Sequence, residues 1–288
     1  MRVTSLPPVR RGIALLRALT FLGAALVLAT VLATALSHIA PLHRMGPRLV
    51  ITPWLIARND LPLLLAALGA AALTLPRGGR NWRAFREVLQ LSGPARETGS
   101  GAGAGLAAIG ALALGLIVTG GLHIAWAGVD AVRLMLYIPA FLTVALAEEL
   151  LFRGAMLFWL SRAVGFLPAL TLTSVLFGLV HWIGSDPWEG AVSAGLIGAF
   201  FGLTLRVRRG LWFAIGFHAA WDYGQSAVLG CRDSGIPSVG ALFDSTPAGP
   251  AWLSGGASGP EGSLLCFTLI LGLSLHLLFP RGKRRVLR

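Results

Sequence analysis

Long apolar blocks, separated by short polar segments, dominate the pattern of residues along the chain. Each block runs for roughly 17–25 residues, the length that a helix needs to cross about 30 Å of hydrocarbon. We predict eight spanning helices, at about residues 18–37, 57–75, 104–127, 134–160, 166–184, 190–205, 211–230 and 263–280. The predicted fold class is therefore all-α, a polytopic integral membrane helical bundle that forms one membrane domain over residues 1–288.

The predicted helices differ in character, and so do the segments between them. The first two are rich in Leu and Ala, and we expect them to face lipid. The run GSGAGAG at 99–105 lacks the Lys and the spacing of a phosphate loop, so we interpret it as a flexible hinge with close helix packing at its end. Residues 231–262 are rich in Gly, Ser and Pro and predict a long, poorly ordered outer loop.

Composition agrees with a membrane protein. The 288 residues are 55% apolar and only 12% charged, with a mean hydropathy of +0.74. A soluble domain normally carries about twice that charged fraction. The two cysteines, one in the outer loop and one in the last predicted helix, argue against a disulfide framework or a structural metal site.

The net charge of +12 is distributed unevenly across the predicted membrane. With the N-terminus inside, eighteen basic residues fall in inner segments and five in outer ones, which predicts that both termini are cytoplasmic. Topology and attraction to anionic lipids explain this charge without nucleic-acid binding. Only one of the 24 basic residues is Lys, which suggests a GC-rich genome and hence a bacterial inner membrane.

Polar side chains gather in three of the predicted helices. They are Glu148, Glu149 and Arg153 in the fourth, His181 in the fifth, and His218 and Asp222 in the seventh. An acidic or basic group at a helix centre costs about 2.5–3.5 kcal/mol on insertion scales, so the four non-histidine groups together oppose insertion by about 10 kcal/mol. We therefore expect these residues to face one another or a water-filled cavity.

Helical spacing divides the acidic pair. Glu149 and Arg153 are four residues apart and lie on one face, so they can pair. Glu148 is rotated by about 100° from its neighbour, which leaves it available to another partner. A polar network that only holds helices together needs one satisfied pair. In this chain Glu148 is a second carboxylate beyond the one in that pair.

Two further pairs have the same spacing. His218 and Asp222 project together from their helix, and Phe177 places an aromatic ring beside His181. A buried carboxylate with nearby imidazoles suits the activation of water, with Glu148 as general base. Hydrolysis of an amide also needs a donor where charge develops on the carbonyl oxygen, and His218 can supply it.

Motifs of other intramembrane hydrolases do not account for these residues. No HExxH surrounds any of the six histidines, which disfavours a zincin-type metalloprotease, and no GxGD of the aspartyl type is present. The letters GASG at 256–259 match a rhomboid-type GxSG, but they lie in the Gly- and Ser-rich outer loop, where chance explains them.

Three motifs, in order on separate apolar helices, carry a resemblance to a known family. They are EExxxR at 148–153, FxxxH at 177–181 and HxxxD at 218–222. This set resembles the CPBP family of CaaX-protease and bacteriocin-processing membrane proteins, also called the abortive-infection or type II CAAX prenyl endopeptidase family. The resemblance covers about residues 130–230, which we take as the catalytic core.

The resemblance implies an all-helical intramembrane glutamic endopeptidase that needs no cofactor or metal. By that analogy Glu148 activates water and His181 orients the water or the glutamate. Glu149 and Arg153 hold the site together, while His218 and the residue four later stabilise the oxyanion.

The last of these positions departs from the family pattern. It is often Asn in the family, and here it is Asp222. Because an ionised Asp cannot donate to an oxyanion, Asp222 either is protonated or orients His218 and keeps it cationic. We favour the second.

Three hypotheses follow for the function. The first is a metal-independent protease that cuts a peptide or protein substrate at the membrane, such as a bacteriocin precursor, a lipidated tail or a sorting-signal protein. The second adds zinc, held by Glu148, His181, His218 and Asp222. The third is a catalytically silent membrane partner, chaperone or immunity factor that uses the polar network for stability.

Overall fold

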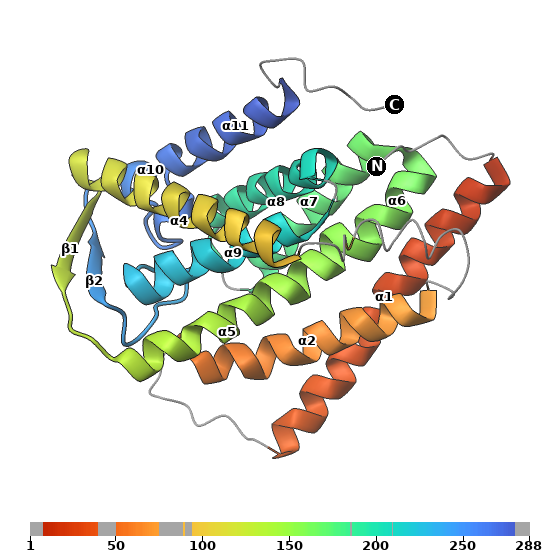
Figure 1. Ribbon diagram of the computed structural model, residues 1–288, viewed down its shortest axis with the longest axis horizontal. Coiled ribbons are helices and arrows are strands. Elements are labelled where there is room, and N and C mark those ends of the chain that lie inside the picture. The colour runs from red at the N-terminus through yellow and green to blue at the C-terminus, as the bar shows by residue number, and fades with distance from the viewer. Residues whose placement is uncertain are drawn as a thin grey trace.

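The computed structural model describes residues 8–39, 50–74, 89, 94–184, 186–208 and 210–279. They form a bundle of long helices with one small two-stranded antiparallel sheet (Figure 1). Its helices are α1 (Pro8–Ile39), α2 (Pro53–Thr74), α4 (Pro94–Val118), α5 (Ala131–Glu148), α6 (Leu157–Val164), α7 (Phe166–Gly184), α8 (Trp188–Arg208), α9 (Trp212–Asp222), α10 (Ala251–Ser254) and α11 (Leu264–Leu278). The described residues also form two π-helices, η1 (Glu149–Met156) and η2 (Tyr223–Val228), and a 3₁₀ turn, η3 (Pro260–Gly262). The predicted all-α membrane bundle is confirmed.

Helical segments occur at all eight predicted positions, but they are not equally long. Six described helices are long and apolar enough to cross a membrane, counting α5, η1 and α6 as one continuous helix over 131–164. The last helix, α11, has 15 residues, and α9 has 11 before it continues into η2. The structure thus supports six spans by length and composition, and the count of eight is not confirmed.

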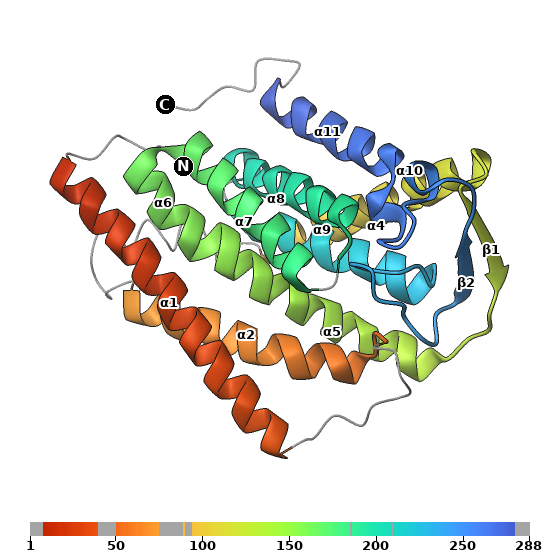
Figure 2. The same cartoon turned by 180° about the vertical axis from the view of Figure 1, so that it is seen from behind.

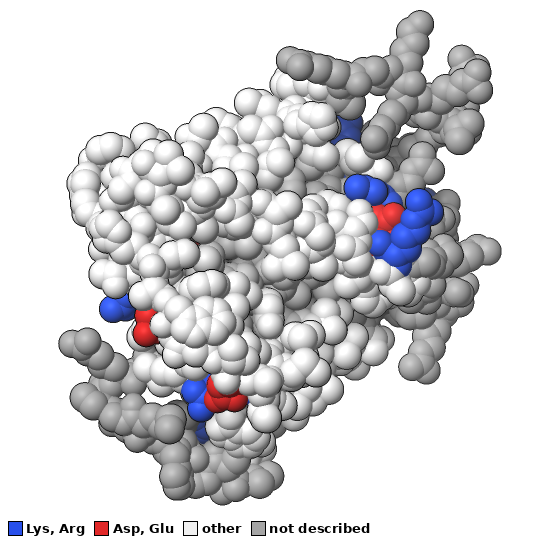
Figure 3. Space-filling model, turned by 60° about the vertical axis from the view of Figure 1, so that its left-hand side comes forward, with Lys and Arg blue, Asp and Glu red and all other residues white. Residues whose placement is uncertain are grey.

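On the face that Figure 3 shows, charged side chains of the described residues are absent from the middle. In the view of Figure 3 they form two groups at opposite ends of the described part, with an uncharged band between them. Many large apolar side chains are exposed, among them Leu114, Val175 and Leu271. In water these would be unfavourable, whereas hydrocarbon solvates them, so this surface fits a lipid bilayer.

The continuous helix formed by α5, η1 and α6 runs through the middle of the bundle. The pair α1 and α2 covers one side of it, while α9 and α4, with α7 and α8, lie on the other (Figures 1 and 2). Because α5 contacts both α2 and α9, side chains on its inward faces meet residues from both halves.

The third predicted helix ends earlier than expected. It was predicted to run to residue 127, but α4 stops at Val118 and the chain turns through Gly120, whose φ of 77° favours glycine. Residues Leu122–Trp126 form β1, which pairs antiparallel with β2 (Phe243–Pro247) in the register Leu122↔Pro247. An apolar run alone does not separate helix from strand, and here the partner strand lies 120 residues away.

The loop at 231–262, which the sequence predicts to lie on the outer side, was expected from its composition to be poorly ordered, and this expectation is wrong. It contains β2, α10 and η3, and it is tied to the start of α2 by a hydrogen bond from the Ile51 amide to the Pro237 carbonyl (2.7 Å). The Tyr137 hydroxyl of α5 lies 2.9 Å from the carbonyl oxygens of both Ile51 and Val239. These contacts fold the loop over one end of the bundle.

The glycine-rich run 99–105 is part of the regular helix α4, so the predicted hinge is wrong while the predicted close packing is confirmed. A Cβ atom at Gly101 or Gly105 would collide with the backbone of α9 at Phe213 or Phe217. Glycines four residues apart let two helix backbones approach closely. They set the position of α9, and with it His218, against the rest of the bundle.

Candidate active site

His218, on α9, is surrounded by three carboxyl groups. Its Nδ1 lies 3.2 Å from Glu149 Oε1, and its Nε2 lies 3.6 Å from Glu148 Oε2 and 3.4 Å from Asp222 Oδ2. The ring stacks on Phe201 at 5.2 Å between centroids. Carboxylate oxygens facing both ring nitrogens favour the imidazolium form, in which both nitrogens donate. The expected projection of His218 and Asp222 toward each other is present.

The predicted pair of Glu149 and Arg153 is also present, and it is fully enclosed. Glu149 Oε1 accepts a hydrogen bond from the Arg153 guanidinium at 3.1 Å, and both side chains are almost completely buried. Arg153 Nε also donates to the Gly198 carbonyl at 3.4 Å, and the guanidinium lies 4.1 Å from the Phe177 ring centroid. The same glutamate oxygen therefore contacts both cations, Arg153 and His218.

A change of helix type begins within the EExxxR motif. Glu148 is the last residue of α5 and Glu149 the first of η1, while Asp222 ends α9 where η2 begins. π-Helical turns are rare and occur frequently at functional sites. The wider turn after Glu148 accompanies an arrangement in which both glutamates reach opposite nitrogens of His218, although an α-helical spacing would separate them by about 100°.

His181, on α7, has a defined tautomer. Its Nδ1 lies 2.9 Å from the Phe177 carbonyl, and because a carbonyl only accepts, Nδ1 carries the proton. In the neutral ring, Nε2 is then the acceptor. The Phe177 ring lies beside the imidazole at 4.4 Å, as predicted. In the described part of the chain, no hydrogen bond or ion pair joins His181 directly to Glu148 or His218.

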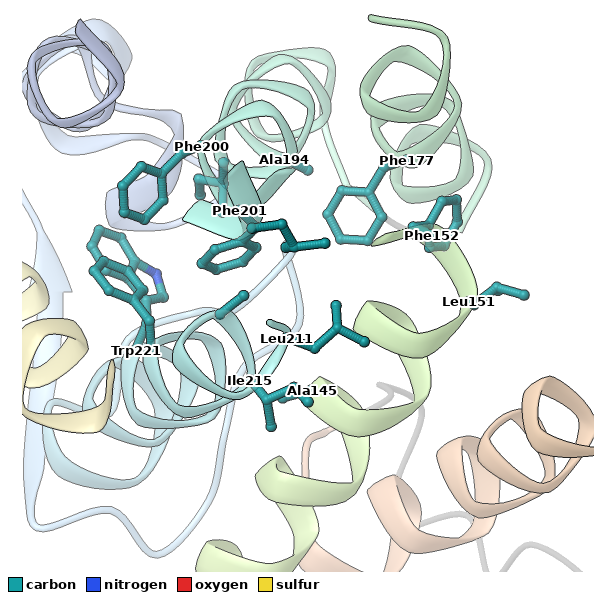
Figure 4. Packing of buried hydrophobic residues seen from close by; sticks show 14 of the residues in the cluster. Ala145, Leu151, Phe152, Phe177, Ala194, Phe200, Phe201, Leu211, Ile215 and Trp221 are labelled. Carbon is teal, nitrogen blue, oxygen red and sulfur yellow. The ribbon is translucent and has the colours of Figure 1, made fainter. Parts of the chain in front are cut away.

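One cavity of about 290 Å³ nevertheless connects the predicted residues. Glu148, His181, His218 and Asp222 all line it, together with Phe177. Phe177 and Phe201 also belong to the buried hydrophobic cluster of Figure 4, where Phe152 lies beside Phe177. Glu149 and Arg153 are not among the lining residues, so they lie behind His218 and Phe177 and support them. A water molecule fits between a carboxylate and an imidazole acceptor in such a cavity.

Three acidic residues that the sequence interpretation left out also line the cavity. They are Asp60 of α2, Asp233 of the outer loop and Glu261 of η3. The second helix, which we expected to face lipid, thus also lines the cavity through Asp60. A carboxyl group within a predicted span was a usable signal for Asp60, since such groups are generally functional. The loop positions of the other two gave no comparable signal.

The two loop acids are held in place and approach Asp222. Asp233 Oδ2 accepts from the Ser226 hydroxyl at 2.9 Å, and Glu261 Oε1 accepts from Trp221 Nε1 at 2.9 Å. Burial raises the pKa of Asp233 and raises that of Glu261 to about 8. Oxygens of Asp222, Asp233 and Glu261 lie within 4.8 Å of one another, so this group has the donors to hold a hard cation.

The region that carries the motifs has a recognisable family relation. Residues 130–224 match the family model described as type II CAAX prenyl endopeptidase Rce1-like. The predicted resemblance is confirmed over this Rce1-like segment, which runs from the residue before α5 to the second residue of η2. No curated protein matches the chain.

The Rce1-like segment contains every residue that the sequence motifs singled out for the site. It excludes Asp60, Asp233 and Glu261, which enter the cavity from α2 and from the outer loop. The family match, together with six helices able to cross a membrane, supports a membrane protease.

Proposed function

We propose that this protein is an intramembrane glutamic endopeptidase that hydrolyses a peptide bond of a membrane-associated or lipidated substrate. The observation that carries the proposal is the position of Glu148. Its carboxylate lines the cavity beside His218, whereas the neighbouring Glu149 forms a buried ion pair with Arg153. Of the two glutamates in the EExxxR motif, Glu148 is therefore the one with access to a water molecule and a substrate carbonyl.

In the proposed first step, Glu148 takes a proton from a water molecule as the water oxygen attacks the carbonyl carbon. The Nε2 acceptor of His181 orients the second hydrogen of that water. The carbonyl oxygen becomes negative, and the imidazolium of His218 donates to it through Nε2. Asp222, 3.4 Å from Nε2, orients the ring and favours its charged form.

In the second step, the tetrahedral intermediate collapses and the C–N bond breaks. The proton held by Glu148 moves to the departing amine, which regenerates the carboxylate. Glu149 and Arg153 contact neither water nor substrate in this scheme. They hold His218 at Nδ1 and keep the phenylalanine rings around it in place.

We further propose that the protein lies in a bacterial inner membrane with both termini in the cytoplasm. The excess of arginine in the predicted inner segments supports this orientation. In this arrangement the loop at 231–262, which carries Asp233 and Glu261, closes the cavity from the outer side. Anionic lipids neutralise the basic inner segments.

The test is proteolysis by the purified full-length protein, with Glu148→Gln as the central variant. We expect Glu148→Gln to lower cleavage by at least about 100-fold, because a positioned general base contributes 10²–10⁴-fold. Its thermal stability should stay near that of the unmodified protein. Cleavage sites come from comparing the termini of membrane proteins in cells that carry each form.

Three measurements separate the alternatives. Full activity of Glu148→Gln would contradict the glutamic mechanism. Loss of activity with a chelator, restored by Zn²⁺, would favour the zinc hypothesis. A biological phenotype that survives alanine at Glu148, His181 and His218 would favour a non-catalytic partner.

A further inference from the structure

Asp60 is one of three acidic residues that line the cavity and take no part in the proposed mechanism, and it is the one that lies in a membrane-spanning helix. It lies in the membrane-spanning helix α2, about two turns after the helix begins at Pro53, and it lines the cavity that contains Glu148. Within the described residues, its carboxyl group has neither a hydrogen bond nor an ion pair. An unpaired carboxyl group within a span is costly, which makes a functional role the default interpretation.

The cavity as a whole is rich in acidic side chains. Its lining holds five carboxyl groups from four elements and two imidazoles, and the described lining residues include no Lys or Arg. The acidic residues are Asp60, Glu148, Asp222, Asp233 and Glu261. Arg153 adds no free positive charge, because it lies outside the lining and pairs with Glu149. Even with Glu261 neutral below its pKa of about 8, four other acidic side chains face the two imidazoles.

Apolar surface accompanies the acids. Phe141, Val144 and Val180 line the same cavity as Asp60. Lys and Arg side chains match both the acidic and the apolar parts of this lining. Their methylene stems pack on apolar surface while the charged head pairs with a carboxylate. A free carboxylate, such as the C-terminus of a peptide, would meet repulsion here.

We infer that the cavity selects a peptide with a Lys or Arg side chain beside the bond that is cleaved, and that Asp60 is the specificity-determining residue that pairs with it. This inference rests on the proposed proteolysis and adds its substrate class. A metal ion on Asp222, Asp233 and Glu261 would leave Asp60 unpaired, because Asp60 is not part of that group. A long cationic side chain can reach Asp60.

The first arm of the test measures cleavage of peptides that differ at one residue. The peptides carry Arg, its neutral isostere citrulline, or Glu next to the scissile bond, and the enzyme is the full chain in lipid nanodiscs. We expect kcat/KM to be at least about tenfold higher for Arg than for citrulline, and lowest for Glu, because a buried charge pair is discriminated strongly from a neutral isostere. Asp60→Asn should shrink the Arg preference to less than about threefold.

The second arm measures binding without catalysis. Glu148→Gln and the double variant Glu148→Gln/Asp60→Asn are titrated with the fluorescent Arg and citrulline peptides. We expect the single variant to bind the Arg peptide about tenfold more tightly than the citrulline peptide, and the double variant to lose most of that difference. Asp244→Asn, an Asp→Asn change on the exposed side of β2, is the matched control and should keep the difference.

The two arms have distinct outcomes. Equal cleavage and equal binding of the Arg and citrulline peptides by protein with intact Asp60 would overturn the inference while leaving the proteolysis standing. Selective binding of the Arg peptide without any cleavage would support the cation site and contradict the proposed function. Selectivity that appears only with added Ca²⁺ or Mg²⁺ would overturn the inference in favour of a metal at Asp222, Asp233 and Glu261. Should Asp60→Asn fail to fold, the comparison of the Arg, citrulline and Glu peptides on the unmodified protein still tests the preference for a cationic side chain.

Discussion

Neighbouring side chains divide the work of the EExxxR motif. Glu149 and Arg153 neutralise each other inside the bundle, and Glu149 also holds His218 by the ring nitrogen that faces away from Glu148. Glu148 then contacts the other nitrogen and the cavity. In the proposed mechanism, the acidic groups that make this helix expensive to insert act as the general base and orient the imidazole of His218.

Glu261 gives a prediction on pH at the same scale. Burial raises its pKa from the ordinary value of 4.5 to about 8, so between these values the folded protein binds a proton that the unfolded chain releases. The contribution of this residue to stability is full below about pH 4.5 and is lost as the pH rises through about 8. We expect hydrogen exchange in the loop at 231–262 to accelerate over this range after correction for the intrinsic rate.

Substitution of the carboxyl group isolates the effect. Glu261→Gln keeps the acceptor for Trp221 Nε1 and removes the titration, so the loop should lose this pH dependence. Asp244→Asn, on the exposed side of β2, should retain it. An unchanged pH profile in Glu261→Gln would show that another group controls the loop.

Helix contacts through glycine set the geometry of the site at the scale of elements. The backbone of α4 meets that of α9 at Gly101 and Gly105, one turn apart, directly beside Phe217 and hence beside His218. In helix interiors glycine lowers stability relative to alanine by about 1 kcal/mol unless close approach requires it. The close approach explains glycine at these two positions.

Two glycines of the same run provide a matched test. Gly105→Ala places a methyl group against the Phe217 backbone, whereas a Cβ at Gly103 meets no atom within 4 Å. We expect Gly105→Ala to lower the unfolding free energy by about 1–3 kcal/mol and to reduce cleavage by moving α9. Gly103→Ala should be neutral or slightly stabilising. Equal effects in thermal unfolding and in cleavage would rule out a role for this contact.

Orientation in the membrane is a property of the whole molecule. The excess of arginine on one side predicts that the end of α8 is cytoplasmic and that the loop containing β2 is on the outer side. Single cysteines at Val207, which is 37% exposed, and at the exposed Asp244 report on these two sides. The two native cysteines are buried, which lowers their background reaction.

In intact cells, a membrane-impermeant maleimide should label Asp244→Cys and spare Val207→Cys until the membrane is opened. The opposite pattern would reverse the topology, and labelling of both in intact cells would contradict the placement of one of them. Whichever side is found, the same experiment shows on which side of the membrane the loop lines the cavity, because Asp233 and Glu261 belong to the loop that carries Asp244.

The sequence by itself determined the class of protein, the positions of the helices and the residues of three motifs. Hydrophobic length and helical spacing are local properties, so they predicted Glu149 with Arg153, His218 with Asp222, and Phe177 with His181. The same reasoning failed where a distant segment decides the structure. Residues 122–126 became a strand because 243–247 lie beside them, and 231–262 became ordered because α2 and α5 bind it.

Only the tertiary structure decided which groups meet. Asp60, Asp233 and Glu261 are far from the motifs in sequence, and packing of α2 and of the outer loop around α5 and α9 brings them to the cavity of Glu148. A charged side chain in a span signals that it needs a partner, but the partner is chosen by the packing of whole helices. The motifs therefore indicated the residues of the candidate site, while the acidic character of the cavity became visible only in three dimensions.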